Sequence, residues 1–286
     1  MKRLLTAIIA SLMALTALFS FTACGSSGEK DLENVKAAGK IVVGMECAYA
    51  PYNWMQTSEN DFTVKVDNNS FADGYDVQIA KKIAEELGVS LYIKPIEWDG
   101  LIPALNSEDI DLVIAGMSPT SERKKSIDFS DIYYESNLVM VVRKSADSKY
   151  TGATKISDFS GAKITGQLNT FHYDVIDQIS GVAKQPALAD FGALTTALKA
   201  GTIDGYVCER PGAISAVTAY PDDFMMIEFS EGNGFTCDPE ESSISVGMRK
   251  NSSLCDIVNN ALAKISNEQR VAMMDAAISR QPVSDN

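Results

Sequence analysis

Short apolar runs and amphipathic stretches alternate along most of the chain. Continuous apolar runs at residues 41–44, 112–115 and 138–142 predict strands that are buried on both faces. Residues 77–87 place isoleucine and alanine three and four positions apart, and Gly88 follows, so this segment predicts an amphipathic helix that ends at a glycine. Buried strands that alternate with such helices are typical of an α/β fold.

Two parts of the chain repeat one pattern. Residues 105–111 and 198–204 each run from a leucine through a short polar connection to Ile-Asp, and an apolar strand follows. The repetition predicts two similarly built lobes. Apolar residues make up 45% of the chain, as in globular proteins. Behind the N-terminal leader roughly 260 residues remain, which is enough for two domains of ordinary size.

The N-terminus has the features of an export signal. Two basic residues precede the uncharged, mostly apolar residues 4–21. The following Thr-Ala-Cys-Gly resembles a lipoprotein processing site, which would remove residues 1–23 and place a lipid on Cys24. Phe21 stands where a leucine is usual, and an uncleaved membrane anchor is the alternative. Residues 25–28, Gly-Ser-Ser-Gly, suit a flexible tether.

Charge and cysteine content exclude some functions. The net charge of −13 argues against a nucleic-acid partner, which would need a basic surface. The chain has one histidine, His172, and neither a CxxC pair nor an HExxH motif, so we expect no metal site and no cofactor. Four cysteines follow the leader, and their spacing leaves open a disulfide within one lobe, Cys208 with Cys237, or four reduced thiols: Cys47, Cys208, Cys237 and Cys255.

A polar loop follows the strand at residues 112–115. Gly116 and Ser118 lie in this loop, and residues 121–127 are predicted to form a helix with Arg123 in its first turn. Open α/β sheets bind ligands at the carboxyl ends of their strands. A helix start and an arginine suit a carboxylate, while a carbonyl and a hydroxyl suit an ammonium. We therefore predict a site for a small zwitterion; the alternative is that Arg123 belongs to a solvated basic face.

The same stretch resembles a known family. Residues 116–123, GMSPTSER, followed by DFSDIYY at 128–134, are similar to a segment of the bacterial extracellular solute-binding proteins of family 3, the amino-acid receptors of ABC importers. The resemblance covers roughly Lys40 to Ala277. It implies a periplasmic-binding-protein-like fold of two α/β lobes joined by a two-strand hinge, with the ligand in the cleft between them. The expected parts are the lipidated N-terminus and tether at 24–39, lobe 1 at 40–138, lobe 2 at 139–244 and a return to lobe 1 at 245–286.

The resemblance also implies roles for the charged and polar residues of the cleft. Arg123 and Thr170 would hold the ligand carboxylate from opposite sides. Gly116, Ser118 and Glu209 would hold its ammonium. The family most often has an aspartate at the position of Glu209; a strand-end glutamate that pairs with the neighbouring arginine at 210 is the alternative.

The resemblance places two aromatic residues and an acid around the ligand side chain. Tyr49 and Trp98 would form opposite walls, with ordinary core packing as the alternative for both. Glu46 matches a position where relatives that bind cationic side chains often have an acid, so we expect arginine or lysine as the ligand. A neutral polar amino acid such as glutamine, or a cystine-like ligand, is the alternative.

Three further residues receive structural interpretations. Asp76 is expected to cap the helix that begins there. Asn169, at a position where the family has glycine, and Thr170 precede a helix expected at residues 171–179. His172 lies one turn into that helix and is interpreted as a surface or rim residue.

Together these features predict a monomeric receptor that is anchored by lipid and faces outside the cell membrane. It would capture a free amino acid by lobe closure and deliver it to ABC transporter permease subunits. No nucleophile triad is present, and we expect no enzymatic activity. A dehydratase-type enzyme on the same fold and a sensor that signals through a separate membrane protein are the other possibilities.

Overall fold

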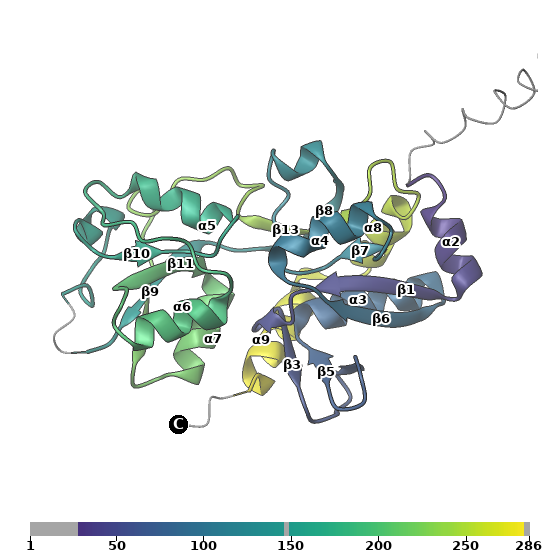
Figure 1. Cartoon of the computed structure of the whole chain (residues 1–286), viewed down its shortest axis with the longest axis horizontal. Helices are drawn as coiled ribbons and strands as arrows, with labels where there is room; N and C mark the ends of the chain where they lie inside the picture. The colour runs from purple at the N-terminus through teal and green to yellow at the C-terminus, as the bar shows by residue number, and fades with distance from the viewer. Residues whose placement is uncertain (1–27, 146–148, 283–286) are drawn as a thin grey trace, which may run out of the picture.

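The computed structural model describes residues 28–145 and 149–282. Figure 1 shows two lobes side by side, one built around β1, β6 and β7 and the other around β9, β10 and β11. The export signal, Cys24 and the greater part of the tether lie outside the described residues. The fold class predicted from the sequence is confirmed: each lobe is an α/β layer structure with its own sheet and buried core.

The first lobe is built on a mixed five-stranded sheet in the order β6-β1-β7-β13-β8. Its strand β1 pairs in parallel with both neighbours, whereas β13 runs antiparallel to β7 and β8. The predicted apolar run at 41–44 lies in β1, and the run at 112–115 forms β7 only at its first two residues. The strands are β1 (Lys40–Met45), β6 (Ser90–Pro95), β7 (Leu112–Val113), β8 (Asp128–Glu135) and β13 (Ser243–Met248).

A small antiparallel sheet extends the first lobe, in the order β2-β3-β5-β4. It includes the aromatic segment that follows β1, and it ends where the first long helix begins. The strands are β2 (Ala48–Tyr49), β3 (Asn53–Gln56), β4 (Val64–Lys65) and β5 (Phe71–Asp73).

The second lobe has a four-stranded sheet in the order β10-β11-β9-β12. Its strands are β9 (Leu138–Arg143), β10 (Ile164–Thr165), β11 (Gly205–Glu209) and β12 (Phe224–Ile227). Alternate residues of β9 enter two different cores: Leu138 and Met140 pack on one face, and Val139 and Val141 on the other. Because both faces are buried, this strand reads as a continuous apolar run rather than an alternating one.

Helices cover the sheets of both lobes (Figure 1). The predicted helix at 77–87 is confirmed as α3, which Gly88 ends in the left-handed conformation with φ 70°. The helices of the first lobe are α2 (Asp31–Ala38), α3 (Tyr75–Leu87), α4 (Leu101–Asn106), α8 (Cys255–Ala263) and α9 (Asn267–Arg280), with the 3₁₀ turns η2 (Trp98–Gly100) and η3 (Arg123–Lys125). Those of the second lobe are α5 (Phe171–Asp174), α6 (Phe191–Lys199) and α7 (Arg210–Ala219), with η4 (Ile156–Phe159) and η5 (Val175–Gln178).

The chain passes from one sheet to the other twice. It leaves the first lobe between β8 and β9 and returns between β12 and β13. The two crossings lie next to each other, since the backbone N–H of Ser136 donates to the carbonyl of Ser242 at 3.3 Å. Such a pair of adjacent connections can act as a hinge between two lobes. The residue boundaries of the lobes given above stay predictions.

Two local predictions are wrong, and a third differs only in the type of helix. The helix expected at 171–179 is present at 171–178 as α5 followed directly by the 3₁₀ turn η5. Residues 121–127, however, contain only the 3₁₀ turn η3. Asp76 makes no capping hydrogen bond at the start of α3; its side chain is buried and is bound by other side chains. A polar run such as residues 121–125 has good capping residues but no apolar face that could hold a longer helix against the core.

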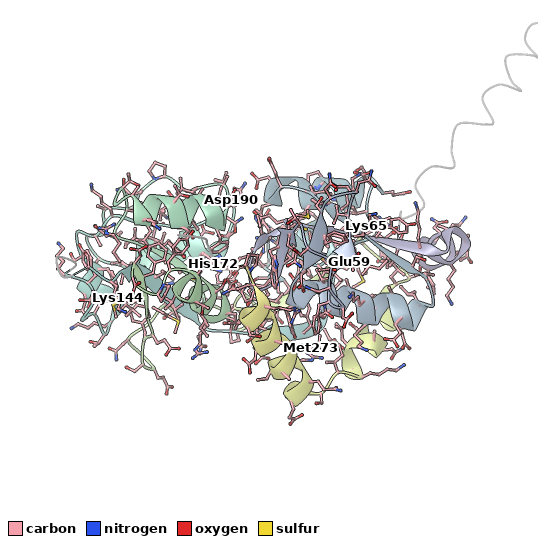
Figure 2. All side chains as sticks on the ribbon, turned by 90° about the horizontal axis from the view of Figure 1, so that it is seen from below. Glu59, Lys65, Lys144, His172, Asp190 and Met273 are labelled. Carbon is pink, nitrogen blue, oxygen red and sulfur yellow. The ribbon has the colours of Figure 1, made fainter. Side chains whose placement is uncertain are left out.

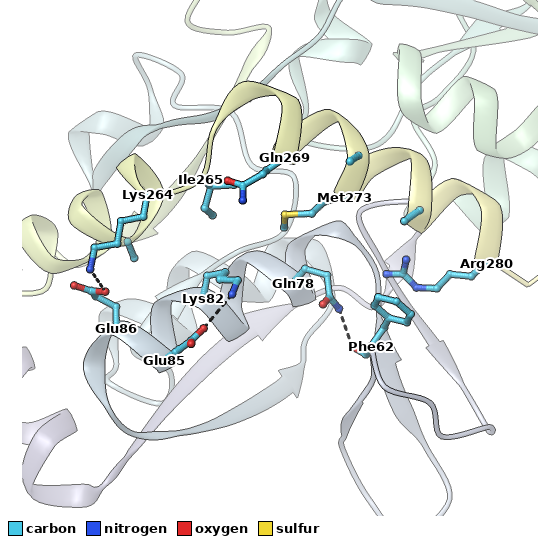
Figure 3. Close-up of a pocket in the computed structure, with 13 residues that line it drawn as sticks. Phe62, Gln78, Lys82, Glu85, Glu86, Lys264, Ile265, Gln269, Met273 and Arg280 are labelled. Atoms are coloured by element: carbon cyan, nitrogen blue, oxygen red, sulfur yellow. Dashed lines mark hydrogen bonds and ion pairs between the residues drawn. The ribbon is translucent and has the colours of Figure 1, made fainter.

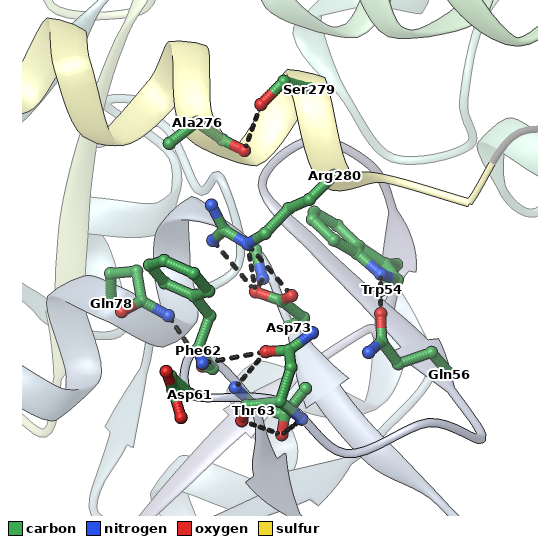
Figure 4. A network of polar contacts seen from close by, with 12 residues as sticks. Trp54, Gln56, Asp61, Phe62, Thr63, Asp73, Gln78, Ala276, Ser279 and Arg280 are labelled. Atoms are coloured by element: carbon green, nitrogen blue, oxygen red, sulfur yellow. Dashed lines mark hydrogen bonds and ion pairs between the residues drawn. The ribbon is translucent and has the colours of Figure 1, made fainter.

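Two arginines, one buried and one partly buried, connect distant elements of the first lobe. Arg249, just after β13, lies 2.7 Å from the Asp31 carboxylate of α2 and is almost fully buried. Near the C-terminus, Arg280 of α9 lies 3.0 Å from the Asp73 carboxylate of β5, and its guanidinium stacks over the ring of Phe62 (Figure 4). These two ion pairs connect the C-terminal part of the chain to N-terminal elements of the first lobe.

Two expectations about membrane segments and thiols can be compared with the described part of the chain. No helix in residues 28–145 and 149–282 has the length and apolar character to cross a bilayer. The four cysteines of the described residues are free thiols, and Cys47 and Cys208 are buried. The disulfide between Cys208 and Cys237 is not formed.

Candidate functional site

The loop after β7 is fixed by a buried polar cluster. Gly116 adopts φ 62°, a conformation that favours glycine, and an added Cβ would meet the Tyr49 ring at 3.1 Å. The Asp76 carboxylate accepts hydrogen bonds from Asn53 and Tyr133 and from the backbone of Gly116. Burial raises the pKa of Asp76 to about 6 although these bonds oppose the shift. Asp76 therefore positions the loop rather than capping a helix.

Arg123 extends from η3 into the space between the lobes. Its guanidinium donates to the carbonyl of Ser118 at 2.9 Å and, across the cleft, to the carbonyl of Asn169 at 3.1 Å. The guanidinium also lies 5.0 Å from the centre of the Trp98 ring. Loss of water lowers the pKa of Arg123 to about 10, so it stays charged at neutral pH. The interpretation of Arg123 as part of a solvated basic face is wrong.

The second lobe opposes Arg123 with the loop after β10. Asn169 has φ 56°, the left-handed conformation that its position required, and its amide donates to Asp99 at 2.8 Å. Thr170 is buried, and its hydroxyl donates to the carbonyl of Gln167. The guanidinium of Arg123 thus already binds this loop through the carbonyl of Asn169. A ligand carboxylate at this position would have to replace that carbonyl as the acceptor.

Glu209 lies at the end of β11 and is fully buried. Tyr49 donates its hydroxyl to Glu209 Oε2, and His172 Nε2 lies 2.7 Å from Glu209 Oε1. Burial alone would raise the pKa of Glu209, but the charge of the nearby His172 and the hydrogen bond from Tyr49 lower it below its usual value. The alternative pairing with Arg210 is wrong, because Arg210 pairs with Glu228 instead.

The two predicted aromatic walls differ in setting. Tyr49 is buried and stacks on Phe191 of the second lobe, with ring centres 4.1 Å apart and planes 7° apart. Trp98 is half-buried, and its indole N–H lies 3.4 Å from the carbonyl of Asn169. Both side chains therefore touch the opposite lobe.

Glu46 also bridges the lobes. Gln167 of the second lobe donates to Glu46 Oε1 at 2.9 Å, while Oε2 is buried without a partner among the described residues. Burial, opposed by the Gln167 hydrogen bond and strengthened by Asp190 and Asp99 nearby, raises the pKa of Glu46 to about 7. A cation beside Oε2 would satisfy this atom and restore the ionised form.

These residues converge on one small cavity. Its volume is about 10 Å³, close to the space of one water molecule. Figure 2 shows His172 at the junction of the two lobes. The lining joins most of the residues proposed from the sequence with three others: Tyr49, Trp98, Gly116, Ser118, Arg123, Gln167, Thr170, Phe171 and His172. Glu209 and Glu46 contact this lining through Tyr49, His172 and Gln167.

Sequence reasoning missed two polar members of this cluster. His172 is buried, so its interpretation as a surface or rim residue is wrong. Gln167 is buried as well, and no role was predicted for it from the sequence. Both residues lie close to Thr170 in the segment after β10, and this position could have indicated that they line the ligand site. The partners that bury them, Glu209 and Glu46, lie far away in the chain.

A larger concavity lies elsewhere on the first lobe. It has a volume of about 590 Å³ between α3, α8 and α9 (Figure 3). Lys82, Glu85, Glu86 and Lys264 form exposed ion pairs along its wall, and Met273 and Ile265 form its apolar floor. It brings together no opposed charges from two lobes and is separate from the candidate site. Nowhere in residues 28–145 and 149–282 do three histidine, cysteine, aspartate or glutamate side chains form a group that could hold a metal ion.

Two α/β lobes with two adjacent crossings, and charged groups from both lobes meeting between them, define the class of periplasmic-binding-protein-like proteins. The chain matches the family model of the bacterial extracellular solute-binding proteins, family 3, over residues 41–277, and it belongs to this family. The family resemblance noted in the sequence is thereby confirmed.

Known members of the family bind amino acids. The chain is 28% identical over 267 residues to the arginine-binding extracellular protein ArtP of Bacillus subtilis, covering 93% of each chain. It is 29% identical over 238 residues to the L-cystine-binding protein TcyJ of Escherichia coli, covering 83% of this chain and 81% of that one. An amino acid ABC transporter substrate-binding protein of Streptococcus pneumoniae, solved bound to L-arginine, superimposes with a TM-score of 0.75 at 28% identity and covers 87% of this chain and 98% of its own.

Proposed function

We propose that this protein is the substrate-binding protein of an amino acid ABC transporter and that it clamps its ligand between the two lobes. The observation that carries the proposal is that Arg123 and Thr170 from opposite lobes line one small cavity, while Glu209 is buried against Tyr49 and His172 of the same lining. The first pair suits a carboxylate and Glu209 suits an ammonium, as an α-amino acid requires.

A ligand must displace contacts that the lobes now make with each other. A cavity of about 10 Å³ holds no amino acid, so the lobes must separate or Tyr49 must turn aside. The ligand carboxylate would replace the carbonyl of Asn169 at Arg123, and the ammonium would replace the Tyr49 hydroxyl or His172 at Glu209. Gly116 and Ser118 would complete the ammonium site.

Within the amino acids, we propose a basic ligand, arginine or lysine. Glu46 has a buried oxygen without a partner and a pKa of about 7, and a cationic side chain would pair with this oxygen. The arginine-bound relative agrees with this choice. The same pKa favours a second candidate, a neutral ligand such as glutamine, because a protonated Glu46 can donate to an amide oxygen.

The test is calorimetric titration with arginine, lysine, glutamine and cystine. A basic ligand should bind the Glu46→Gln variant at least tenfold more weakly, while glutamine should lose much less. Glu59→Gln, an exposed acid on the same lobe, is the matched control and should change neither. Equal losses for both ligands would remove Glu46 as the selector. If no amino acid binds the native chain, the proposed function itself is wrong.

The remaining parts of the proposal concern anchoring and partners. We place the protein outside the cell membrane, held by a lipid on Cys24, as a monomer that delivers its ligand to the permease subunits. Mass spectrometry of the protein isolated from the membrane fraction should find residues 1–23 removed and a lipid on Cys24. A chain that retains residues 1–23, or a Cys24 without lipid, would contradict lipid anchoring.

A further inference from the structure

The proposed ammonium site already contains a buried cation partner. His172 and Glu209 expose 4% and 1% of their surface, and His172 Nε2 lies 2.7 Å from Glu209 Oε1. Tyr49 donates to the other oxygen. Both oxygens of the carboxylate that would receive a ligand ammonium are therefore engaged by side chains of the protein.

The surroundings of His172 make its charge depend on Glu209. The imidazole lies against Phe171, with ring centres 4.3 Å apart, and meets the edge of Phe191 at 6.2 Å. Its Nδ1 is buried without a hydrogen-bond partner among the described residues, and its Nε2 meets Glu209 Oε1 as a close ion-pair contact that lacks hydrogen-bond geometry. A charged imidazole in such an apolar setting is stabilised by the carboxylate beside it, and it loses that stabilisation if another cation takes the carboxylate.

Other ionisable groups around Glu209 come from both lobes. They include Arg123 from η3 and Asp76 from α3, which interact electrostatically with Glu209, and three groups that stay neutral at physiological pH. Burial raises the pKa of each of these three groups far above the neutral range: Tyr49, Tyr52 and Cys208. Asp76, with a pKa of about 6, can also exchange a proton near neutral pH, but its carboxylate is bound by Asn53 and Tyr133 and does not contact the carboxylate of Glu209.

We infer that binding of the amino acid expels a proton from His172, because the ligand ammonium takes the place of the imidazolium beside Glu209. This inference rests on the proposed function. The proton on Nε2 goes to solvent, the ligand keeps all its own protons, and Glu209 stays ionised throughout. Two adjacent cations would otherwise share one buried carboxylate, which their repulsion in a water-poor site disfavours.

A proton that leaves on binding makes affinity depend on pH. While His172 is charged in the unliganded protein, the affinity should rise about tenfold for each unit of pH, since one proton is released for each ligand bound. Once His172 is neutral before binding, the affinity should become constant. His172 is thus a residue of the ammonium site that sets the pH range in which the receptor fills.

Calorimetry can count the released proton. The amino acid with the largest thermal shift is titrated at about pH 6, near the ordinary pKa of histidine, in two buffers with different ionisation enthalpies. For each ligand bound, the wild-type protein should release close to one proton more than the His172→Gln variant, whose amide can still donate to Glu209.

Glu46 needs its own control, because its pKa of about 7 lets a cationic ligand displace a proton there too. The Glu46→Gln variant should keep the release that His172 supplies, even if it binds more weakly. Release that persists in His172→Gln and disappears in Glu46→Gln would overturn the inference. Binding with no proton release in the wild-type protein would overturn it too, whereas absence of binding by any amino acid would refute the proposed function instead.

A direct readout is available because His172 is the one histidine in the sequence. In a tag-free protein its imidazole C–H proton signals in the NMR spectrum are unambiguous. At about pH 6 these signals should move from the charged toward the neutral position when the ligand is added. Signals that stay at the charged position on saturation would overturn the inference even if His172→Gln failed to fold.

Discussion

Gln167 and Glu46 form a hydrogen bond across the cleft, from the amide of one lobe to the carboxylate of the other at 2.9 Å. The bond leaves the second oxygen of Glu46 buried and without a partner in the described chain. In water this carboxyl would be ionised near neutral pH, whereas here it is close to half protonated. Burial of Glu46 between the lobes therefore costs free energy when its carboxyl is ionised, and this cost rises with pH.

The first prediction concerns stability against pH. The pKa of Glu46 rises from 4.5 to about 7 on folding, so the folded state holds this proton more tightly than the unfolded state does. Its contribution to the free energy of unfolding is full below about pH 4.5 and is lost as the pH rises through 7. The loss should approach about 3 kcal/mol. Denaturant unfolding of Glu46→Gln should show a flatter profile over this range.

Asp76 has a pKa of about 6 and adds a change of the same sign in every variant, so the comparison must use the difference between Glu46→Gln and wild type. Glu59→Gln again serves as the exposed control. Parallel profiles for wild type and Glu46→Gln would show that the pKa of Glu46 does not rise on folding.

The second prediction concerns the carboxylate site. Arg123→Ala should weaken binding of any α-amino acid by several kcal/mol, about 3 or more, because the ligand carboxylate would be buried without its partner. Arg123→Lys should recover only part of the loss, since an ammonium cannot form the paired hydrogen bonds of a guanidinium. Lys125→Ala, at an exposed ion pair of the same turn, should bind normally in calorimetry. Near-native affinity of Arg123→Ala would refute the assignment of this site.

Buried strands and long helices could be predicted because their signals are local. The apolar run in β9 and the glycine after α3 each describe an environment that neighbouring residues share. The loop containing Gly116 and the conformation of Asn169 could be identified for a similar reason: short motifs specify backbone geometry. These features gave the fold and most of the residues that line the cavity.

Interactions between the lobes could not be predicted in the same way. The burial of His172 depends on Glu209 and that of Asp76 on Tyr133, and nothing near either residue in the sequence signals the distant partner. The capping residues around Arg123 favour a helix, but the residues that follow offer no apolar face, and only the short turn η3 forms. The burial of His172 and Asp76 therefore depends on tertiary contacts that the local sequence does not show.

The third prediction separates two tyrosines of the cavity. Tyr49→Phe removes the hydroxyl that donates to Glu209, so it should lower the free energy of unfolding by about 1 to 3 kcal/mol. It should also strengthen amino acid binding several-fold, because the ammonium no longer competes with that hydroxyl. Tyr52→Phe is the matched control: its buried hydroxyl has no partner within the described residues, and its loss should not destabilise the protein. Weaker binding of Tyr49→Phe would mean that the hydroxyl contacts the ligand.

The last prediction tests what joins the C-terminal part of the chain to the first lobe. Arg249 donates from two nitrogens to the Asp31 carboxylate and also to the carbonyls of Leu105 and Ile110, and both charges are almost fully buried. Arg249→Met should cost about 3 to 5 kcal/mol in denaturant unfolding, because Asp31 would remain as an unpaired buried charge. Combining it with Asp31→Asn should restore part of that loss.

Lys250→Ala breaks the half-exposed ion pair with Asp128 at the next position and should cost at most about 1 kcal/mol. Ligand affinity should be nearly unchanged in the folded fraction of all these variants, since this pair is separate from the cavity between the lobes. A cost for Arg249→Met no larger than that for Lys250→Ala would mean that α2 and the return strand hold together without their buried charge pair.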